Sequence, residues 1–216
     1  MKWAFLDVIP ADQAREFLSV ARRRRFERGE TIFHEGDPGD TVHLLDKGRV
    51  AVRVTTPLGD TATIRVLGPG EIFGELAVIS PWPRTATVRA LEPAETLVMS
   101  SDRIDQLRRA HPEVDRVMLE ALIGEVRRLT HQLLDALYLP VPKRLARCLV
   151  DLSEQYGSGD ASVLVPLNQD DVADLCGASR PTVNKILQEL ESQGLIELGR
   201  GRISIVDCGA LGRLAR

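Results

Sequence analysis

Between residues 30 and 100 the chain alternates apolar with polar residues, which is the two-residue period of a half-buried β-strand. Turn-forming stretches rich in glycine, proline and aspartate separate these segments at intervals of about 8–12 residues. Strands are therefore expected at 31–34, 41–45, 49–56, 61–67 and 85–91. Short strands in this rhythm predict a small antiparallel barrel or jelly roll.

From Ser101 onward the period becomes helical, and the longest helix is expected at 113–138, which has no proline and only one glycine. Its apolar residues recur every three or four positions and form a stripe: Val114, Met118, Leu122, Val126, Leu129, Leu133 and Leu137. At about 1.5 Å per residue the helix is about 38 Å long, more than such a barrel can cover. We expect its C-terminal half to pair with a second copy of the chain; purely intramolecular packing is the alternative.

Two prolines, Pro140 and Pro142, end this helix because proline breaks the hydrogen-bond ladder. The chain is therefore expected to divide into a barrel domain at 1–110, the long helix at 111–139 and a C-terminal domain at 140–216. In the C-terminal domain a helix is expected from about 143 to 156, followed by a loop at 157–160. The predicted fold class is α+β.

Segment 168–187, NQDDVADLCGASRPTVNKIL, has the spacing of two helices joined by a tight turn. Asn168 and Ser179 are placed to cap the two helices, and Gly177 allows the left-handed turn between them. The inner faces are expected to be Val172, Ala173, Leu175 and Cys176 on the first helix and Val183, Ile186 and Leu187 on the second. This pattern predicts a helix-turn-helix, with an ordinary helical hairpin as the alternative.

The outward face of the second helix carries donors suited to phosphates or base edges: Arg180, Thr182, Asn184 and Lys185. Residues 196–206, IELGRGRISIV, predict a hairpin that turns at Gly199-Arg200-Gly201 and serves as a wing beside that helix. From residue 140 onward nine Lys and Arg stand against ten Asp and Glu, so a positive surface must be local to this face and to Arg200 and Arg202.

Composition narrows the class of protein. With 216 residues, 44% hydrophobic and 27% charged, the chain fits a soluble globular protein, and no run reaches the about 20 apolar residues that span a bilayer. We expect a cytoplasmic protein with no membrane partner. Three distant cysteines without a C-x-x-C pair make a disulfide framework or a structural metal site unexpected. The arginines at 22–25 are expected to form a solvated stretch just before the first strand.

One charged residue stands out among the predicted strands. Residues 73–88 read FGELAVISPWPRTATV, and Arg84 has no acid beside it in sequence. A buried guanidinium is costly unless it is paired. Either Glu75 or another carboxylate satisfies it as a structural salt bridge, or Arg84 awaits an anionic ligand. The second is favoured because Gly74 ends a strand where backbone amides can converge, and because Glu75 can accept from a sugar hydroxyl while Arg84 holds a phosphate.

These residues resemble a known family. GELA at 74–77 followed by RTA at 84–86 is similar to the phosphate-binding cassette of cyclic-nucleotide-binding domains. Together with EGD at 35–37, the glycine turn at Gly48 and ASRPTVNKIL at 178–187, the chain resembles the cyclic-AMP receptor protein and fumarate-nitrate regulator family of bacterial transcription regulators. The resemblance extends from about residue 6 to 205. It implies an N-terminal jelly-roll domain that binds cyclic nucleotide, a long dimerisation helix and a C-terminal winged helix-turn-helix.

The resemblance also implies roles for single residues in the ligand pocket. Glu75 would bind the ribose 2′-OH and Arg84 the cyclic phosphate. Gly74, at the end of a strand, would also belong to the ligand site. The amides of Leu76, Thr85 and Ala86 would hold the remaining phosphate oxygens. Thr130 would contact adenine, whereas Leu129 stands where a second hydroxyl is expected. The effector is expected to be cyclic AMP, with cyclic GMP as an alternative because Thr85 offers a hydroxyl to a purine amino group.

On the DNA side the resemblance implies phosphate contacts by Gln169 and Thr182 and a guanine contact by Arg180. Ser179, Asn184 and Lys185 complete the expected DNA-binding set. Pro181 replaces a glutamate of the family's best-known member, so the operator is expected to differ at that base pair. The implied partners are a palindromic DNA site, a second copy of the chain through 113–138, and RNA polymerase.

Other classes of protein stay open at this point. A regulator of the same fold could respond to cyclic di-GMP or to no small ligand. A haem sensor would need axial ligands such as His34 and His43, and an iron–sulfur sensor would lack cysteines before Cys148. For an enzyme, the sequence offers no paired carboxylates, nucleophile–base arrangement or metal spacing, so no catalytic residue is expected.

Overall fold

In a computed structural model, residues 3–56, 59, 61–79, 82–157 and 162–215 are described. The chain forms two compact units, Met1–Arg128 and Leu129–Arg216, and the long helix α4 (Glu113–Tyr138) belongs to both. Within the described ranges no helix is long and apolar enough to cross a membrane.

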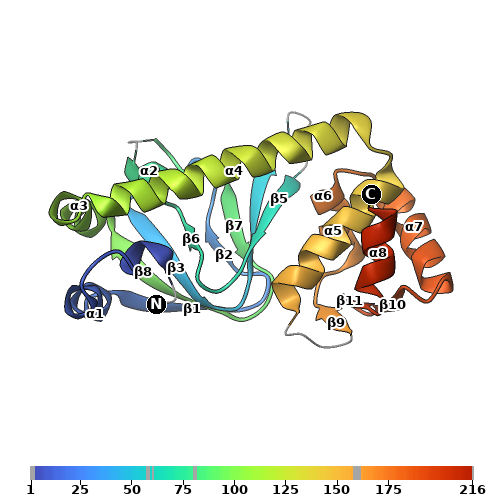
Figure 1. Cartoon of the computed structure of the whole chain (residues 1–216), viewed down its shortest axis with the longest axis horizontal. Coiled ribbons are helices and arrows are strands. Elements are labelled where there is room, and N and C mark those ends of the chain that lie inside the picture. The colour runs from blue at the N-terminus through green and yellow to red at the C-terminus, as the bar shows by residue number, and fades with distance from the viewer. Residues whose placement is uncertain (1–2, 57–58, 60, 80–81, 158–161, 216) are drawn as a thin grey trace. The chain divides into compact units, whose positions relative to one another are not determined.

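The first unit contains two four-stranded antiparallel sheets, and this architecture confirms the predicted jelly roll (Figure 1). In their spatial order, the strands of the first sheet are β1 (Arg22–Phe26), β8 (Ala94–Ser100), β3 (Thr41–Lys47) and β6 (Ile72–Phe73). Those of the second sheet are β2 (Thr31–Phe33), β7 (Thr87–Ala90), β4 (Val50–Thr55) and β5 (Thr61–Leu67).

The arginine run at 22–25 is a correction to the sequence interpretation. It is not a stretch before the first strand, because it forms strand β1 itself and pairs with β8. Cross-strand ion pairs explain how so charged a strand forms: Arg23 Nη1 lies 2.6 Å from Asp46 Oδ2 and 2.7 Å from Glu95 Oε2. Arg24 covers the buried ring of Phe26, with its guanidinium carbon 5.0 Å from the ring centroid.

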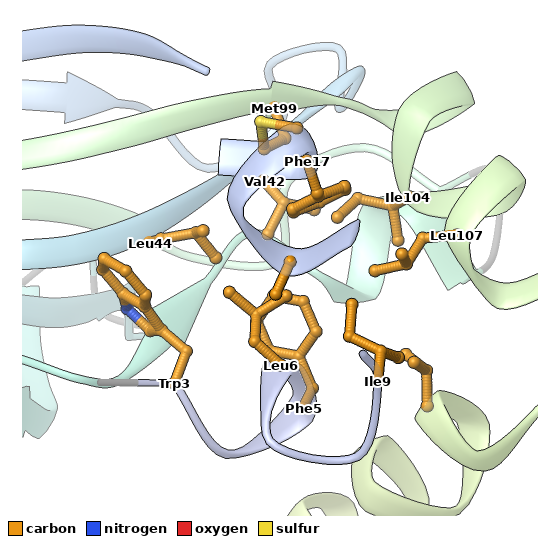
Figure 2. Close-up of a cluster of buried hydrophobic side chains, with 12 residues drawn as sticks. Trp3, Phe5, Leu6, Ile9, Phe17, Val42, Leu44, Met99, Ile104 and Leu107 are labelled. Atoms are coloured by element: carbon orange, nitrogen blue, oxygen red, sulfur yellow. The ribbon is translucent and has the colours of Figure 1, made fainter. Parts of the chain in front are cut away.

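An apolar cluster closes one end of the barrel, where the N-terminal segment meets the helices that follow β8 (Figure 2). The elements are the 3₁₀ turn η1 (Ala4–Leu6), α1 (Ala11–Ser19) and α3 (Ser101–Ala110). Phe5 and Phe17 pack edge to face with centroids 6.2 Å apart, and Ile104 and Leu107 of α3 complete the cluster. Val114, in the first turn of α4, is buried in the same cluster and so anchors α4 to the barrel.

A second cluster fills the barrel and surrounds one histidine. His43 lies on β3 and is stacked on Phe73, with ring centroids 4.9 Å apart and 15° between the planes. Its Nδ1 shares a hydrogen bond of 3.2 Å with Thr96 Oγ1. Burial, assisted by the positive charges of Arg84 and Arg24, lowers the pKa of His43 to about 3. His43 is therefore neutral at physiological pH.

Helix α4 has the predicted bounds, but the predicted single stripe is divided between two surroundings. Val114 is buried, and Val117 and Met118 pack against the first cluster. Leu122 is half-buried, whereas these later apolar residues are exposed: Leu119, Ile123, Val126, Leu129, Leu133, Leu134 and Leu137. The predicted intramolecular alternative therefore accounts for the part of α4 up to Arg128, where Glu125 and Arg128 also bond to the barrel.

The second unit begins within α4, at Leu129, and continues past the end of that helix at Tyr138. Helix α5 (Val141–Tyr156) starts two residues before the predicted 143, because Pro142 lies in the first turn, where a missing N–H leaves no helical bond unmade. The remaining elements are β9 (Val163–Val165), α6 (Gln169–Cys176), α7 (Arg180–Ser192), β10 (Ile196–Gly199), β11 (Arg202–Ile205) and α8 (Cys208–Leu214). The three strands form an antiparallel sheet in the order β10-β11-β9, and the predicted wing hairpin is confirmed.

The buried neutral His43 makes the unfolding free energy sensitive to acid. Its folded-state pKa of about 3 is below the ordinary value of 6.5, so the folded chain binds fewer protons, and stability is lost as pH falls from 6.5 towards 3. We measure the free energy of unfolding by urea at pH 7, 6 and 5 for the unaltered protein and for His43→Phe. Near pH 5 we expect this free energy to change with pH less steeply in His43→Phe, by about 1.4 kcal/mol per pH unit. Equal slopes for the two proteins would contradict a buried neutral histidine.

Candidate functional site

The centre of the barrel site is Arg84, whose side chain is almost fully buried at 5% exposure. Its Nη1 donates to the carbonyl of Gly74 at 2.8 Å, and its Nη2 donates to Thr41 Oγ1 at 2.9 Å. The guanidinium carbon lies 4.2 Å from the centroid of the Phe33 ring. Its Nε is buried and has no hydrogen-bond partner among the described residues. The cation is therefore held by neutral partners and keeps an unused donor.

This arrangement bears on the two interpretations of Arg84. The predicted structural salt bridge to Glu75 is not among the ion pairs of the described residues, and both acceptors of Arg84 are uncharged. Burial lowers the pKa of Arg84 below its ordinary value, and Asp40, Glu75 and Asp37 counter this only through their electric field. A buried cation whose hydrogen-bond acceptors are neutral favours an anionic ligand.

Gly74 is fitted to this arginine. Its backbone has a φ of +82°, a value that residues other than glycine rarely adopt. A Cβ built there would lie 2.5 Å from Arg84 Nη1 and 3.2 Å from the carbonyl of Thr41. The absence of a side chain at position 74 therefore lets the guanidinium reach its acceptors.

Glu75 follows directly and opens α2 (Leu76–Ile79), the short helical turn that the sequence predicts. Its side chain is half-buried beside a small cavity with apolar lining residues: Phe5, Val42, Ile72, Ile104, Leu107, Val114 and Met118. Burial raises the pKa of Glu75 above its ordinary value, against the opposing effects of its own backbone N–H, Arg65 and Arg84. The carboxylate lacks strong donors in this structure, which suits it to accept from an incoming hydroxyl.

The other predicted pocket residues lie on both sides of Arg84. Leu76 and Thr85 are exposed and Ala86 is buried. The segment is fixed by backbone bonds, since Arg84 N donates to the carbonyl of Asp37 and Gly36 N donates to the carbonyl of Arg84, each at 2.8 Å. Thr130 is exposed on α4, within the second compact unit.

Two partners of Arg84 escaped the sequence interpretation. Thr41 lies at the start of β3 and Phe33 at the end of β2, 43 and 51 positions before Arg84 in the chain. A threonine or phenylalanine gives no local sequence signal for a guanidinium partner. Strand pairing alone brings Thr41 and Phe33 to Arg84. The turn residues at 36–39 lie between Phe33 and Thr41 and mark only the ends of their two strands.

The helix-turn-helix of the second unit forms as predicted. Asn168 caps α6 through a reciprocal capping box with Asp171, in which Asp171 N donates to Asn168 Oδ1 at 2.8 Å. Gly177 adopts the left-handed conformation, with φ 61° and ψ 45°. Ser179 caps α7 by accepting from the backbone N–H of Thr182 at 3.4 Å. The expected inner faces are buried, except that Leu175 is only half-buried.

The outward face of α7 carries three of the four expected donors, since Arg180, Thr182 and Lys185 are exposed. Asn184 departs from the expectation: it is half-buried, and its Oδ1 is buried without a partner among the described residues. Arg180 forms an ion pair with Asp170 of α6, a partner that the sequence interpretation missed. Gln169, half-buried, is the first residue of α6.

The hydroxyls of Ser179 and Thr182 share a hydrogen bond of 2.8 Å at the start of α7. In the wing, Arg200 and Arg202 are exposed at the turn, where Gly201 has a φ of 68°. Among the described residues, no three His, Cys, Asp or Glu side chains gather as a metal site would require.

Comparison with known proteins identifies a domain in each half of the chain. Residues 23–111 match the cyclic nucleotide-binding domain model, and residues 143–214 match the Crp-like helix-turn-helix domain model. The CRP-like cAMP-activated global transcriptional regulator of Mycobacterium tuberculosis is 34% identical over 88% of this chain and 87% of its own length. This chain belongs to the CRP family of transcription regulators.

A second relative supports this assignment, and a solved structure shows the same fold. The cyclic AMP receptor protein of Thermus thermophilus is 30% identical over 92% of this chain and 90% of its own length. The solved structure of FixK2 from Bradyrhizobium japonicum covers 91% of this chain and 98% of its own with a TM-score of 0.81; at 20% identity it shows the shared fold. The chain is therefore a CRP-family cyclic-nucleotide-binding transcription regulator, and the related proteins are regulators rather than enzymes.

Gly74 offers a direct test of how this CRP-family pocket is built. We expect Gly74→Ala to lose about 1–2 kcal/mol of stability for its positive φ and a further ~1–3 kcal/mol for crowding Arg84. Gly36→Ala is a matched control, because Gly36 has a φ of +87° and no atom within 4 Å of its added Cβ. Urea unfolding and nucleotide calorimetry of the two variants would separate the effects. Equal losses in both would show that contact with Arg84 is unimportant.

Proposed function

We propose that the protein is a homodimeric regulator that binds palindromic DNA when cyclic AMP occupies the barrel pocket. The observation that carries this proposal is Arg84, a buried cation with neutral partners and an unused Nε donor. A cyclic phosphate supplies the missing anion. The names of the two curated relatives, a cAMP-activated regulator and a cyclic AMP receptor protein, support the choice of nucleotide.

In the proposed complex the phosphate lies on Arg84, with Gly74 leaving room beside it. The backbone amides of Leu76, Thr85 and Ala86 donate to the other phosphate oxygens. Glu75 accepts from the ribose 2′-OH, which gives its half-buried carboxylate the donor it lacks in the described structure. A cyclic nucleotide satisfies both groups at once because its phosphate and its ribose hydroxyl lie close together.

The proposed dimer forms through α4. Its exposed side chains include the series Leu119, Ile123, Val126, Thr130, Leu133 and Leu137, with spacing 4-3-4-3-4. This is the 3.5-residue period of a coiled-coil seam, and so many exposed apolar residues in a row require a partner. Thr130 is the polar member of the seam, which places a hydroxyl where two copies meet and where adenine would be contacted.

The proposed DNA contacts lie on α6 and α7. Gln169 and Thr182 contact phosphates, and Arg180 reads a guanine with its two-pronged donor group. Ser179 and Lys185 lie on the same exposed surface, and Asn184 contributes only if its half-buried amide turns outward. RNA polymerase is the proposed partner of the DNA-bound dimer.

A second effector is favoured by one observation, the exposed hydroxyl of Thr85 beside Arg84. A threonine there can accept from the amino group of guanine, so cyclic GMP is the alternative ligand. Cyclic di-GMP shares the anionic phosphate and serves as a third ligand in the test. A regulator with no small ligand would bind none of the three.

We expect Arg84→Leu to weaken cyclic AMP binding by about 100-fold or more, since two charge-assisted hydrogen bonds of about 1.5–3 kcal/mol each are lost. Calorimetry with cyclic AMP, cyclic GMP and cyclic di-GMP measures this and identifies the effector. Arg89→Leu is the control, because Arg89 is an exposed arginine that donates to the carbonyl of Gly29 and has no role in the proposed pocket; affinity should stay within about twofold. Unchanged nucleotide-dependent DNA binding in Arg84→Leu would refute gating through this pocket.

On DNA, Arg180→Gln should cost about 1–3 kcal/mol and relax specificity at one base pair in each half-site. Lys185→Gln should weaken binding to all sequences alike and reduce the salt-dependence slope by about one per half-site. Binding titrations over a salt series, on a palindrome selected from random DNA and on its half-site, test both. Equal affinity for the palindrome and the half-site would argue against a dimer.

A further inference from the structure

The contact between α4 and the barrel changes in kind along the helix. Its beginning is held by apolar packing, in which Val114 is buried and Met118 lies against the first cluster. Past Met118 most large apolar side chains are exposed, whereas Leu122 is half-buried. Further along α4 two charged residues, Glu125 and Arg128, bond to the barrel, and both are half-buried. Figure 1 shows this part of α4 running beside the strands of the barrel.

Four side chains make this contact, and we call them the charged clasp: Arg65, Glu71, Glu125 and Arg128. Arg65, on β5, donates from Nη1 to Glu125 at 2.6 Å and from Nη2 to Glu71 at 2.5 Å. Arg128 donates from Nε to Glu125 at 2.9 Å and from Nη1 to the carbonyl of Ile64 at 3.1 Å. The clasp therefore binds α4 to β5 and to the turn that follows β5.

The clasp differs from an ordinary surface ion pair. Its side chains are only 27–36% exposed, and both oxygens of Glu125 are engaged. Hydrogen bonds from Arg128, and the charge of Arg65, lower the pKa of Glu125 below its ordinary value, so this carboxyl is ionised at neutral pH. Networks of this kind bind more firmly than isolated exposed pairs, because each side chain is already fixed by another.

The clasp also lies on the path to the nucleotide pocket. Glu71 directly precedes β6, which leads into Gly74 and Glu75, and Glu71 Oε2 accepts from the backbone N–H of Gly68 at 2.7 Å. The charges of Arg65 and Glu125 act on Glu75 with opposite sign, since Arg65 favours its ionised form and Glu125 opposes it. Segment 71–75, which carries Glu75, is thus linked to α4 both by hydrogen bonds and by electrostatic interaction.

We propose that Arg65 and Glu125 are positioning residues that couple nucleotide occupancy at Gly74–Glu75 to α4. The inference rests on the proposed function, because it assumes that nucleotide binding alters DNA binding through that helix. A nucleotide that draws Glu75 towards its ribose shifts the segment 71–75, and the clasp transmits this shift to α4. Since α4 continues into the second unit, it carries the shift beyond the barrel.

The test compares full-length Arg65→Gln, Glu125→Gln and the double variant with the unaltered protein. For each, DNA affinity is measured with and without saturating cyclic AMP, and the ratio gives the coupling, which for allosteric proteins is about 5–150-fold. We expect each single variant to bring the ratio close to 1 and the double variant to add little more, because both substitutions break one link. Arg116→Gln is the control: its exposed pair with Glu120, 3.1 Å apart, lies on the same helix outside the clasp.

Nucleotide affinity from calorimetry gives a second readout that a merely structural salt bridge would not produce. Arg65→Gln should weaken cyclic AMP binding and Glu125→Gln should strengthen it, because the two charges act on Glu75 in opposite directions. Folded variants that keep the coupling of the unaltered protein would overturn the inference, as would a change of affinity in the same direction for both.

The unaltered protein separates failure of the inference from failure of the proposed function. If it binds cyclic nucleotide but its DNA affinity does not change, gating fails and the inference with it. If it binds no cyclic nucleotide, the proposed function itself is refuted.

Discussion

The site in the barrel depends on the buried guanidinium of Arg84, which forms no ion pair among the described residues. A cation taken out of water is costly, and here two neutral acceptors and the face of the Phe33 ring offset part of that cost. The remainder stays as a local demand for negative charge. Gly74 has no side chain because the guanidinium occupies the space, and the backbone around Gly36 and Asp37 is fixed to hold Arg84 in place. A pocket of this kind favours an anion before any other feature of the ligand is considered.

The charged clasp is a different electrostatic arrangement from that of Arg84. In the charged clasp two arginines face two glutamates, so the group is close to neutral and makes no comparable demand for a ligand. Glu75 lies between the two arrangements, half-buried, beside an apolar cavity and under the opposing fields of Arg65 and Glu125. Burial raises the pKa of Glu75, and a hydrogen bond donated by an incoming ligand would oppose that effect by stabilising the carboxylate.

Local signals allowed much of this structure to be predicted from sequence. The bounds of α4, the cap at Asn168 and the left-handed Gly177 follow from helical period, capping chemistry and glycine geometry, and no tertiary contact overrides them. Strand β1 could not be found this way: its arginines show no alternation, and their partners Asp46 and Glu95 are distant in sequence. The same reason hid Thr41 and Phe33 from Arg84. Residue types identified the chemistry of the site, whereas its geometry depends on strand pairing.

The apolar surface of α4 shows where periodicity alone misleads. Reading every apolar residue as one stripe gave a 4-4-4-3-4-4 spacing, yet one helix can present two adjoining faces to two partners. Val114 and Met118 serve the barrel, and the seam that begins at Leu119 follows a strict 3.5-residue period. After half-buried Leu122, Glu125 and Arg128 hold α4 to β5 through hydrogen bonds and charge. In the proposed dimer, α4 is bound by the barrel on one side and by the second copy of the chain on the other. A shift of α4 against the barrel therefore also moves the seam, in which Thr130 is the polar residue.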